Sequence, residues 1–218
     1  MCFCASASFM AGAPLAAVGG VTLSKAKTKS QLPFAAVPLL FGIQQAIEGV
    51  VWVTFSQSLA IVHMIATYGY AIFAYVLWPI FLPFAILLLE TVPWRKKVLM
   101  VLQSLGLVVG LYLLYFIFSS HVTSHVVSHS IVYSFWQPFG KLSIGLYLIA
   151  GCLSFFFSSK KIVNFLGGLL TVSLAITYFF YTVYVVSVWC FFSALLSSVI
   201  LFYFIKQEKE YKKATHGA

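Results

Sequence analysis

Residues 32–52 read LPFAAVPLLFGIQQAIEGVVW. The run is long enough to cross the apolar core of a bilayer as a helix, which takes about 20 residues. It nevertheless carries Gln44, Gln45 and Glu48. A carboxylate at such a depth is costly unless it is paired, protonated or in contact with water, so ionisable groups inside membrane helices are functional candidates. The stretch therefore predicts a membrane-spanning helix with a polar site inside it.

The whole chain has the composition of a membrane protein. Of its 218 residues, 62% are hydrophobic and 8% are charged, which leaves too little polar surface to cover a water-soluble globule. The net charge of +9 comes from short basic clusters between apolar runs, a pattern typical of membrane topology. We predict an all-α, multi-pass integral membrane protein that contacts the lipid bilayer and binds no nucleic acid.

The apolar runs predict one domain, residues 1–205, with seven transmembrane helices, followed by a basic tail at 206–218. The first run should be retained as a span, because no basic segment precedes it as in a signal peptide. The third contains Pro79 and Pro83 and should be kinked or tilted. The last stretch is about twice one crossing, so we expect a turn near residues 181–183. The seven spans are expected at about residues 3–23, 32–55, 59–89, 98–118, 142–157, 162–180 and 184–205.

The basic residues predict the orientation, because cytoplasmic loops are enriched in Lys and Arg. In a seven-span arrangement the first, third and fifth connections and the tail are basic, whereas the other connections hold only Lys141. The N-terminus is therefore expected outside and the C-terminus in the cytoplasm.

This orientation brings several polar side chains to similar depths near the outer face. Glu48, Gln44 and Gln45 could form a notch that binds an ion, a proton or a head group. His63 begins the next span after a short turn, so it is a candidate for the same site. The alternative is structural, since polar side chains also link membrane helices by hydrogen bonds.

A tetrapeptide repeat places His121, His125 and His129 in the polar segment 119–141. A spacing of four puts neighbouring histidines on one face of either a helix or a strand. Adjacent imidazoles can chelate a transition metal such as zinc. The alternative is a flexible exported loop whose histidines are solvated.

Four cysteines, at Cys2, Cys4, Cys152 and Cys190, are too few for a disulfide scaffold. Cys2 and Cys190 are candidates for redox chemistry, and an outward-facing Cys2 or Cys4 could form a disulfide or bind a soft metal. Cys2 and Cys4 are too close together for an unstrained bridge to each other. Cys152 and Cys190 can equally be small buried residues.

Several motifs together carry a resemblance. The opening MCFCASASF, the stretch at 32–52, the LWP at 77–79, the LLLE that ends at Glu90 and the SVWCFF at 187–192 resemble an uncharacterised family of bacterial multi-span membrane proteins. Its members begin with Met-Cys-Phe-Ser-Ala and are known as a domain of unknown function; Cys4 stands here where they have Ser. The resemblance covers nearly the whole chain and implies a multi-pass protein of the bacterial inner membrane, without a known activity. The matching positions are Cys2, Gln44, Gln45, Glu48, Glu90, Trp189 and Cys190.

Three classes of function follow from these candidates. The first is binding or transport of an ion or small solute at an outward-facing polar site around Glu48 and His63. The second is a metal-dependent membrane hydrolase in which His63 and two repeat histidines bind the metal and Glu48 is the general base. The third is a redox or sensor protein that uses Cys2 and Cys190. A purely structural subunit is also compatible with the sequence.

Overall fold

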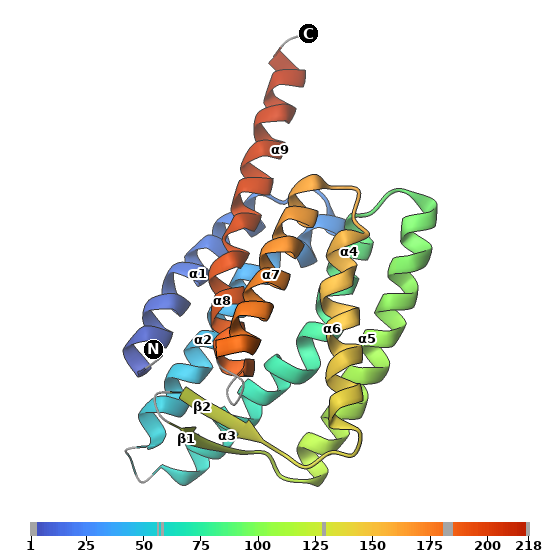
Figure 1. The fold of residues 1–218 in the computed structure, drawn as a ribbon. Coiled ribbons are helices and arrows are strands. Elements are labelled where there is room, and N and C mark those ends of the chain that lie inside the picture. The colour runs from blue at the N-terminus through green and yellow to red at the C-terminus, as the bar shows by residue number, and fades with distance from the viewer. Residues whose placement is uncertain (1–3, 56, 58, 128–129, 181–184, 217–218) are drawn as a thin grey trace.

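A computed structural model describes residues 4–55, 57, 59–127, 130–180 and 185–216, with side chains up to residue 209. The described helices stand side by side as a bundle, from which the C-terminal helix projects at one end (Figure 1). The helices are α1 (Ala5–Lys25), α2 (Leu32–Phe55), α3 (Ala60–Ala71), α4 (Trp78–Leu89), α5 (Pro93–Ser119), α6 (Gly140–Phe156), α7 (Lys161–Phe180), α8 (Val185–Ser197) and α9 (Val199–His216). A 3-10 turn, η1 (Lys29–Gln31), precedes α2, and a π-helical segment, η2 (Ile72–Leu77), joins α3 to α4.

The helices fit a membrane protein by length and composition. Within the described residues, six helical stretches are long and apolar enough to cross a membrane. The fifth of the seven predicted spans, residues 142–157, corresponds to α6, which is also apolar but has only 17 residues. This length is about 25 Å at about 1.5 Å per residue. Seven crossings therefore stay a prediction. The expected turn at residues 181–183 lies outside the described residues.

The prediction of an all-α fold is wrong in one place. The segment after α5 forms an antiparallel hairpin of β1 (Thr123–Val127) and β2 (Ser130–Ser134), with His125 opposite Val132. The hairpin covers the end of the bundle opposite the projecting α9 (Figure 1). Ile131 and Tyr133 of β2 are buried, and their spacing of two is the period of a strand. This burial explains why the polar segment pairs as strands.

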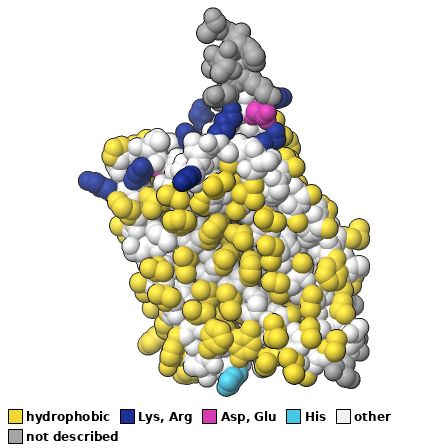
Figure 2. Space-filling model, turned by 180° about the vertical axis from the view of Figure 1, so that it is seen from behind, with side chains coloured by type: hydrophobic (Ala, Val, Ile, Leu, Met, Phe, Trp, Pro, Cys, Tyr) yellow, Lys and Arg dark blue, Asp and Glu magenta, His cyan; other side chains and the backbone are white. Residues whose placement is uncertain are grey.

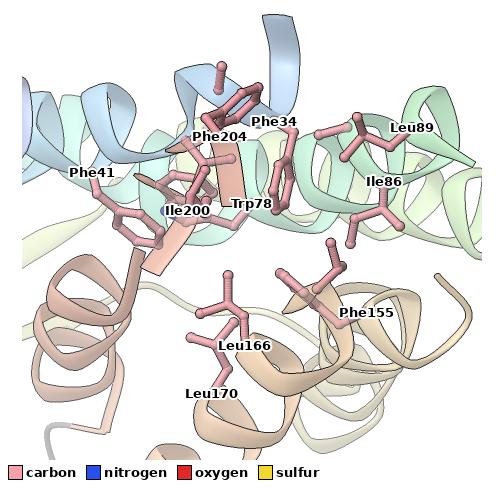
Figure 3. Close-up of a cluster of buried hydrophobic side chains, with 14 of the residues drawn as sticks. Phe34, Phe41, Trp78, Ile86, Leu89, Phe155, Leu166, Leu170, Ile200 and Phe204 are labelled. Atoms are coloured by element: carbon pink, nitrogen blue, oxygen red, sulfur yellow. The ribbon is translucent and has the colours of Figure 1, made fainter. Parts of the chain in front are cut away.

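A large apolar core lies toward the α9 end of the bundle. Figure 3 shows side chains of α2, α4, α6, α7 and α9 pointing toward one another there. The ring of Phe41 stacks on Trp78 with their centroids 3.8 Å apart. The cluster fixes α2 against the rest of the bundle and therefore fixes the direction in which the polar residues of α2 point. Members labelled in Figure 3 are Phe34, Phe41, Trp78, Ile86, Leu89, Phe155, Leu166, Leu170, Ile200 and Phe204.

The third predicted span bends through η2, just before Pro79. The carbonyl of Ala74 would have Pro79 as its partner at i+5, but proline has no N–H to donate. The hydroxyl of Tyr147 on α6 donates to this carbonyl instead, at 2.9 Å. A Cβ on Gly106 of α5 would collide with the Pro79 carbonyl oxygen, so glycine allows α5 to pack closely here. The expected irregularity at Pro79 is thus present as a π-helical segment.

Basic side chains gather at the end of the bundle from which α9 projects, and the surface below them is mostly apolar (Figure 2). Lys25 of α1 forms an ion pair with Glu208 of α9, with Nζ and Oε2 2.5 Å apart. Arg95 of α5 donates to the carbonyl of Ser158, between α6 and α7, at 2.6 Å. At the basic end these contacts join α1 to α9, and α5 to the α6–α7 turn. The predicted tail continues α9 as a helix to His216.

Candidate binding site beside Glu48

Glu48 lies in the half of α2 that faces away from the basic end, and only 3% of its surface is exposed. Ser187 of α8 donates a hydrogen bond from Oγ to Glu48 Oε1 at 2.5 Å. The serine is itself buried. The carboxyl group is therefore held by a helix that lies 139 positions away in the sequence.

Further polar side chains surround this pair. Gln45 and Tyr70 lie near the carboxyl of Glu48 without a hydrogen bond of standard geometry. The ring of Tyr70 stacks on Tyr133 of β2, with centroids 4.2 Å apart and planes inclined by 13°. We call the whole group the Glu48 cluster; it consists of Gln44, Gln45, Glu48, Tyr70, Tyr133, Ser187 and Cys190.

The Glu48 cluster has unused hydrogen-bonding capacity. Gln44 Oε1 accepts from the indole Nε1 of Trp78 at 2.7 Å. In the described part of the chain, however, Gln44 Nε2, both polar atoms of the Gln45 side chain and the hydroxyls of Tyr70 and Tyr133 have no partner. Buried polar groups are nearly always hydrogen-bonded, so such a concentration of unpaired atoms needs an explanation. Of these residues, Tyr133 also lines a neighbouring cavity, where a bound molecule would reach its hydroxyl.

A cavity of about 610 Å³ lies directly beside the cluster. Its volume is in the range of small-molecule sites, about 300–1,000 Å³. Ser187, Cys190 and Tyr133 line it on the cluster side, and aromatic and aliphatic side chains from η2, α5, α6 and α7 form the other walls. An apolar cavity with polar groups converging at one side is the usual form of a ligand site.

Three other polar side chains on the walls donate their hydrogen bonds to backbone carbonyls. Tyr147 donates to the Ala74 carbonyl, Trp189 Nε1 donates to the Leu170 carbonyl at 3.3 Å, and Thr171 Oγ1 donates to the Gly167 carbonyl at 2.9 Å. These three residues therefore present mainly carbon to the cavity. Its hydrogen-bonding groups are concentrated on the side of the Glu48 cluster.

His63 belongs to a different group of residues. Its Nδ1 lies 2.8 Å from Thr54 Oγ1 and its Nε2 lies 2.9 Å from Ser124 Oγ. The imidazole thus links the end of α2, the start of α3 and β1. Among the described residues no hydrogen bond connects His63 to Glu48, and the shared site stays a prediction.

The two described histidines of the repeat, His121 and His125, differ in their backbone setting. His121 precedes β1 with a left-handed backbone (φ 55°), which interrupts the regular alternation, and its Nδ1 is 3.3 Å from the Tyr68 hydroxyl. His125 is exposed on β1, and His129 lies outside the described residues. The described residues contain no group of three His, Cys, Asp or Glu side chains that could hold a metal.

The cysteines are separated from one another. Cys190 is buried in the Glu48 cluster, and Cys2 lies outside the described residues. Cys4 is exposed, with Sγ 2.8 Å from Ser6 Oγ, and this hydrogen bond lowers the pKa of the thiol. Cys4, Cys152 and Cys190 are all free thiols.

Glu90, the second buried acid singled out by the resemblance, is held by hydrogen bonds from the backbone of two turns. Its Oε1 accepts from the backbone N–H of Thr91 at 2.8 Å and Val92 at 2.9 Å, and its Oε2 accepts from that of Ser159 at 2.5 Å. Burial alone would raise the pKa of Glu90, but the donors at Val92, Ser159 and Thr91 together lower it. The carboxylate ties the α4–α5 turn to the α6–α7 turn.

Sequence reasoning missed three members of the cluster. Ser187 and Cys190 are three positions apart, so they share a helix face, and this spacing was a usable signal. Tyr70 gives a weaker signal as a polar group inside an apolar span. Tyr133 gives none, because it reaches the cluster only when the hairpin folds over the bundle end.

Comparisons with curated proteins and with solved structures find no match to this chain. One family model, described as a family of unknown function (DUF6629), matches residues 1–216. The match includes the whole of the Glu48 cluster. The chain therefore belongs to the DUF6629 family.

Proposed function

We propose that this protein binds a small solute at an outward-facing membrane site formed by the Glu48 cluster and the adjoining cavity. The observation that carries the proposal is a cavity of about 610 Å³ on whose lining the buried groups of Ser187 and Cys190 meet the unpaired hydroxyl of Tyr133. A bare ion would need several oxygen ligands at once. The mostly apolar walls favour an organic molecule with a polar group at one end.

The proposal includes seven membrane crossings, an external N-terminus and a location in the bacterial inner membrane. The gathering of basic side chains at the α9 end supports this orientation, because cytoplasmic segments are enriched in Lys and Arg. Glu48 lies in the opposite half of α2, so the solute would enter from the outer side. His63 would act at this end as a link between α2, α3 and β1.

A metal-dependent hydrolase is supported by no specific observation. Both ring nitrogens of His63 already contact hydroxyl groups of Thr54 and Ser124. The described residues also lack a third neighbouring ligand. Solute binding is therefore the function that the geometry supports best.

The experiment uses a neutral probe, n-octanol, titrated into the full-length protein in phosphatidylcholine nanodiscs, with empty nanodiscs as the blank. Ala175 of α7 lines the cavity, so Ala175→Trp should fill part of it. Ile176 is exposed and does not line the cavity, so Ile176→Trp is the matched control. We expect saturable binding that Ala175→Trp abolishes and Ile176→Trp preserves. Absence of saturable binding, or equal binding by both variants, would overturn the proposal.

A further inference from the structure

The hydrogen bond between Ser187 and Glu48 determines what Ser187 offers to the cavity. A hydroxyl has one hydrogen, and that of Ser187 is donated to Glu48. Ser187 also lines the cavity, where its oxygen can therefore only accept a hydrogen bond. An acceptor that is backed by a carboxylate favours a donor group, and a cationic donor most of all.

The buried carboxyl of Glu48 has no positive partner among the described residues. Its contacts come from Ser187, Gln45 and Tyr70, all of which are neutral side chains. Lys25 and Glu208 form an ion pair at the basic end, at the far end of α2 from Glu48. Buried charges in proteins are normally paired or neutralised. A cation carried by the bound molecule would complete this pairing.

The cavity walls also suit a cation attached to an apolar body. Tyr147 and Trp189 meet edge to face, with centroids 6.4 Å apart, and Tyr75 lies on the same lining. Aromatic ring faces attract ammonium groups, because the ring carries partial negative charge on its face. Aliphatic side chains such as Leu113 and Leu148 complete the walls and suit a hydrocarbon chain.

We propose that the cavity binds a protonated organic amine with an apolar body, whose ammonium group donates a hydrogen bond to Ser187 Oγ and is compensated by the Glu48 carboxylate. This inference rests on the proposed function and narrows its ligand to one chemical class. Anionic amphiphiles should be excluded, because their charge would face the same carboxylate. The hydroxyl of Tyr133, buried and without a partner, offers the ammonium group a second acceptor.

The test compares n-octylammonium, n-octanol and n-octanoate in the same phosphatidylcholine nanodiscs by isothermal titration calorimetry at neutral pH. We expect octylammonium to bind roughly tenfold more tightly than octanol, as a charge-assisted hydrogen bond would provide. Octanoate should not bind. In Glu48→Gln, the ratio of the octylammonium affinity to the octanol affinity should fall from roughly ten to about one. Glu208→Gln, which removes a carboxylate at the basic end, is the matched control and should change neither.

Ser187→Ala provides a second variant that does not depend on the folding of Glu48→Gln. It removes the acceptor while the other cavity walls remain, so the roughly tenfold preference for octylammonium over octanol should disappear. If octanol binds and Ala175→Trp blocks it, but octylammonium has no advantage or keeps its advantage in Glu48→Gln and Ser187→Ala, the amine inference is overturned and the proposed function stands. If octanol shows no saturable binding to the wild-type protein, both proposals fail.

Discussion

Glu48 and Glu90 are both buried acids in the helical bundle, with 3% and 1% of their surfaces exposed, but their surroundings differ. Glu90 accepts three backbone hydrogen bonds at a turn of the basic end. Glu48 accepts one, from Ser187, and lies among polar groups that lack partners. Burial alone therefore does not distinguish a structural acid from a binding acid; the number and origin of the donors do.

Two of the three backbone N–H groups that donate to Glu90 are close to it in the sequence. Thr91 and Val92 follow it directly, and Ser159 comes from the neighbouring turn. Backbone donors are fixed by the fold, so they satisfy the carboxylate permanently. Glu48 accepts its hydrogen bond from a side chain of another helix, Ser187, whose oxygen can still accept a hydrogen bond from a ligand.

The largest expected effect is that of Glu90→Ala. Removing the carboxylate leaves three backbone N–H groups without their acceptor, which should lower the free energy of unfolding by on the order of 3 kcal/mol. Equilibrium unfolding in mixed micelles of increasing SDS content would measure this loss. A change below about 1 kcal/mol would contradict the structural role assigned to Glu90.

The second prediction concerns acid. Since the pKa of Glu90 is lowered in the folded protein, its stabilising contribution is fully present above the unfolded pKa of about 4.3 and disappears as the pH falls through the lowered folded value. The difference in unfolding free energy between wild type and Glu90→Gln should therefore shrink below about pH 4. The chain has only four acidic residues, so few other carboxylates titrate in this window. A difference that is independent of pH would contradict the lowered pKa.

A smaller effect is expected at the other acid. Glu48→Gln keeps an acceptor for Ser187 and removes a buried charge, a type of change that is often neutral or stabilising. We expect the free energy of unfolding to change by less than about 1 kcal/mol, measured in the same SDS titration. A loss as large as that of Glu90→Ala would make Glu48 a structural acid and remove the difference between the two sites.

The smallest effect is a labelling pattern that tests which end faces outward. Cys4 lies at the Glu48 end of the bundle, since Phe9 of α1 packs against Gly49 of α2. In a Cys2→Ser background, a membrane-impermeant maleimide added to intact cells should label the exposed Cys4 and leave the buried Cys190 unmodified. Cys4→Ser should abolish labelling. Labelling only after the membrane is opened would place the Glu48 end in the cytoplasm and would contradict the proposed orientation.

Parts of the candidate site could be predicted from the sequence, because acidic and amide side chains are rare inside long apolar helices. Glu48, Gln44 and Gln45 are noticeable because the surrounding run is apolar. Ser187 is not noticeable, because a serine in a membrane helix usually bonds to its own backbone; Ser197, for example, donates to the Ala194 carbonyl at 2.6 Å. The sequence places His63 at a depth similar to that of Glu48. In the structure, however, His63 Nε2 contacts Ser124 Oγ of the hairpin.

The sequence by itself determined that the chain is built from apolar helices with basic residues between them, because span length and charge patterning are local properties of the chain. It also identified Glu48 as an exceptional acid. Only the tertiary structure decided that Ser187, Tyr70 and Tyr133 meet it, that the hairpin covers this end, and that a cavity lies beside them. These contacts join segments far apart in the chain, so packing between elements decides them.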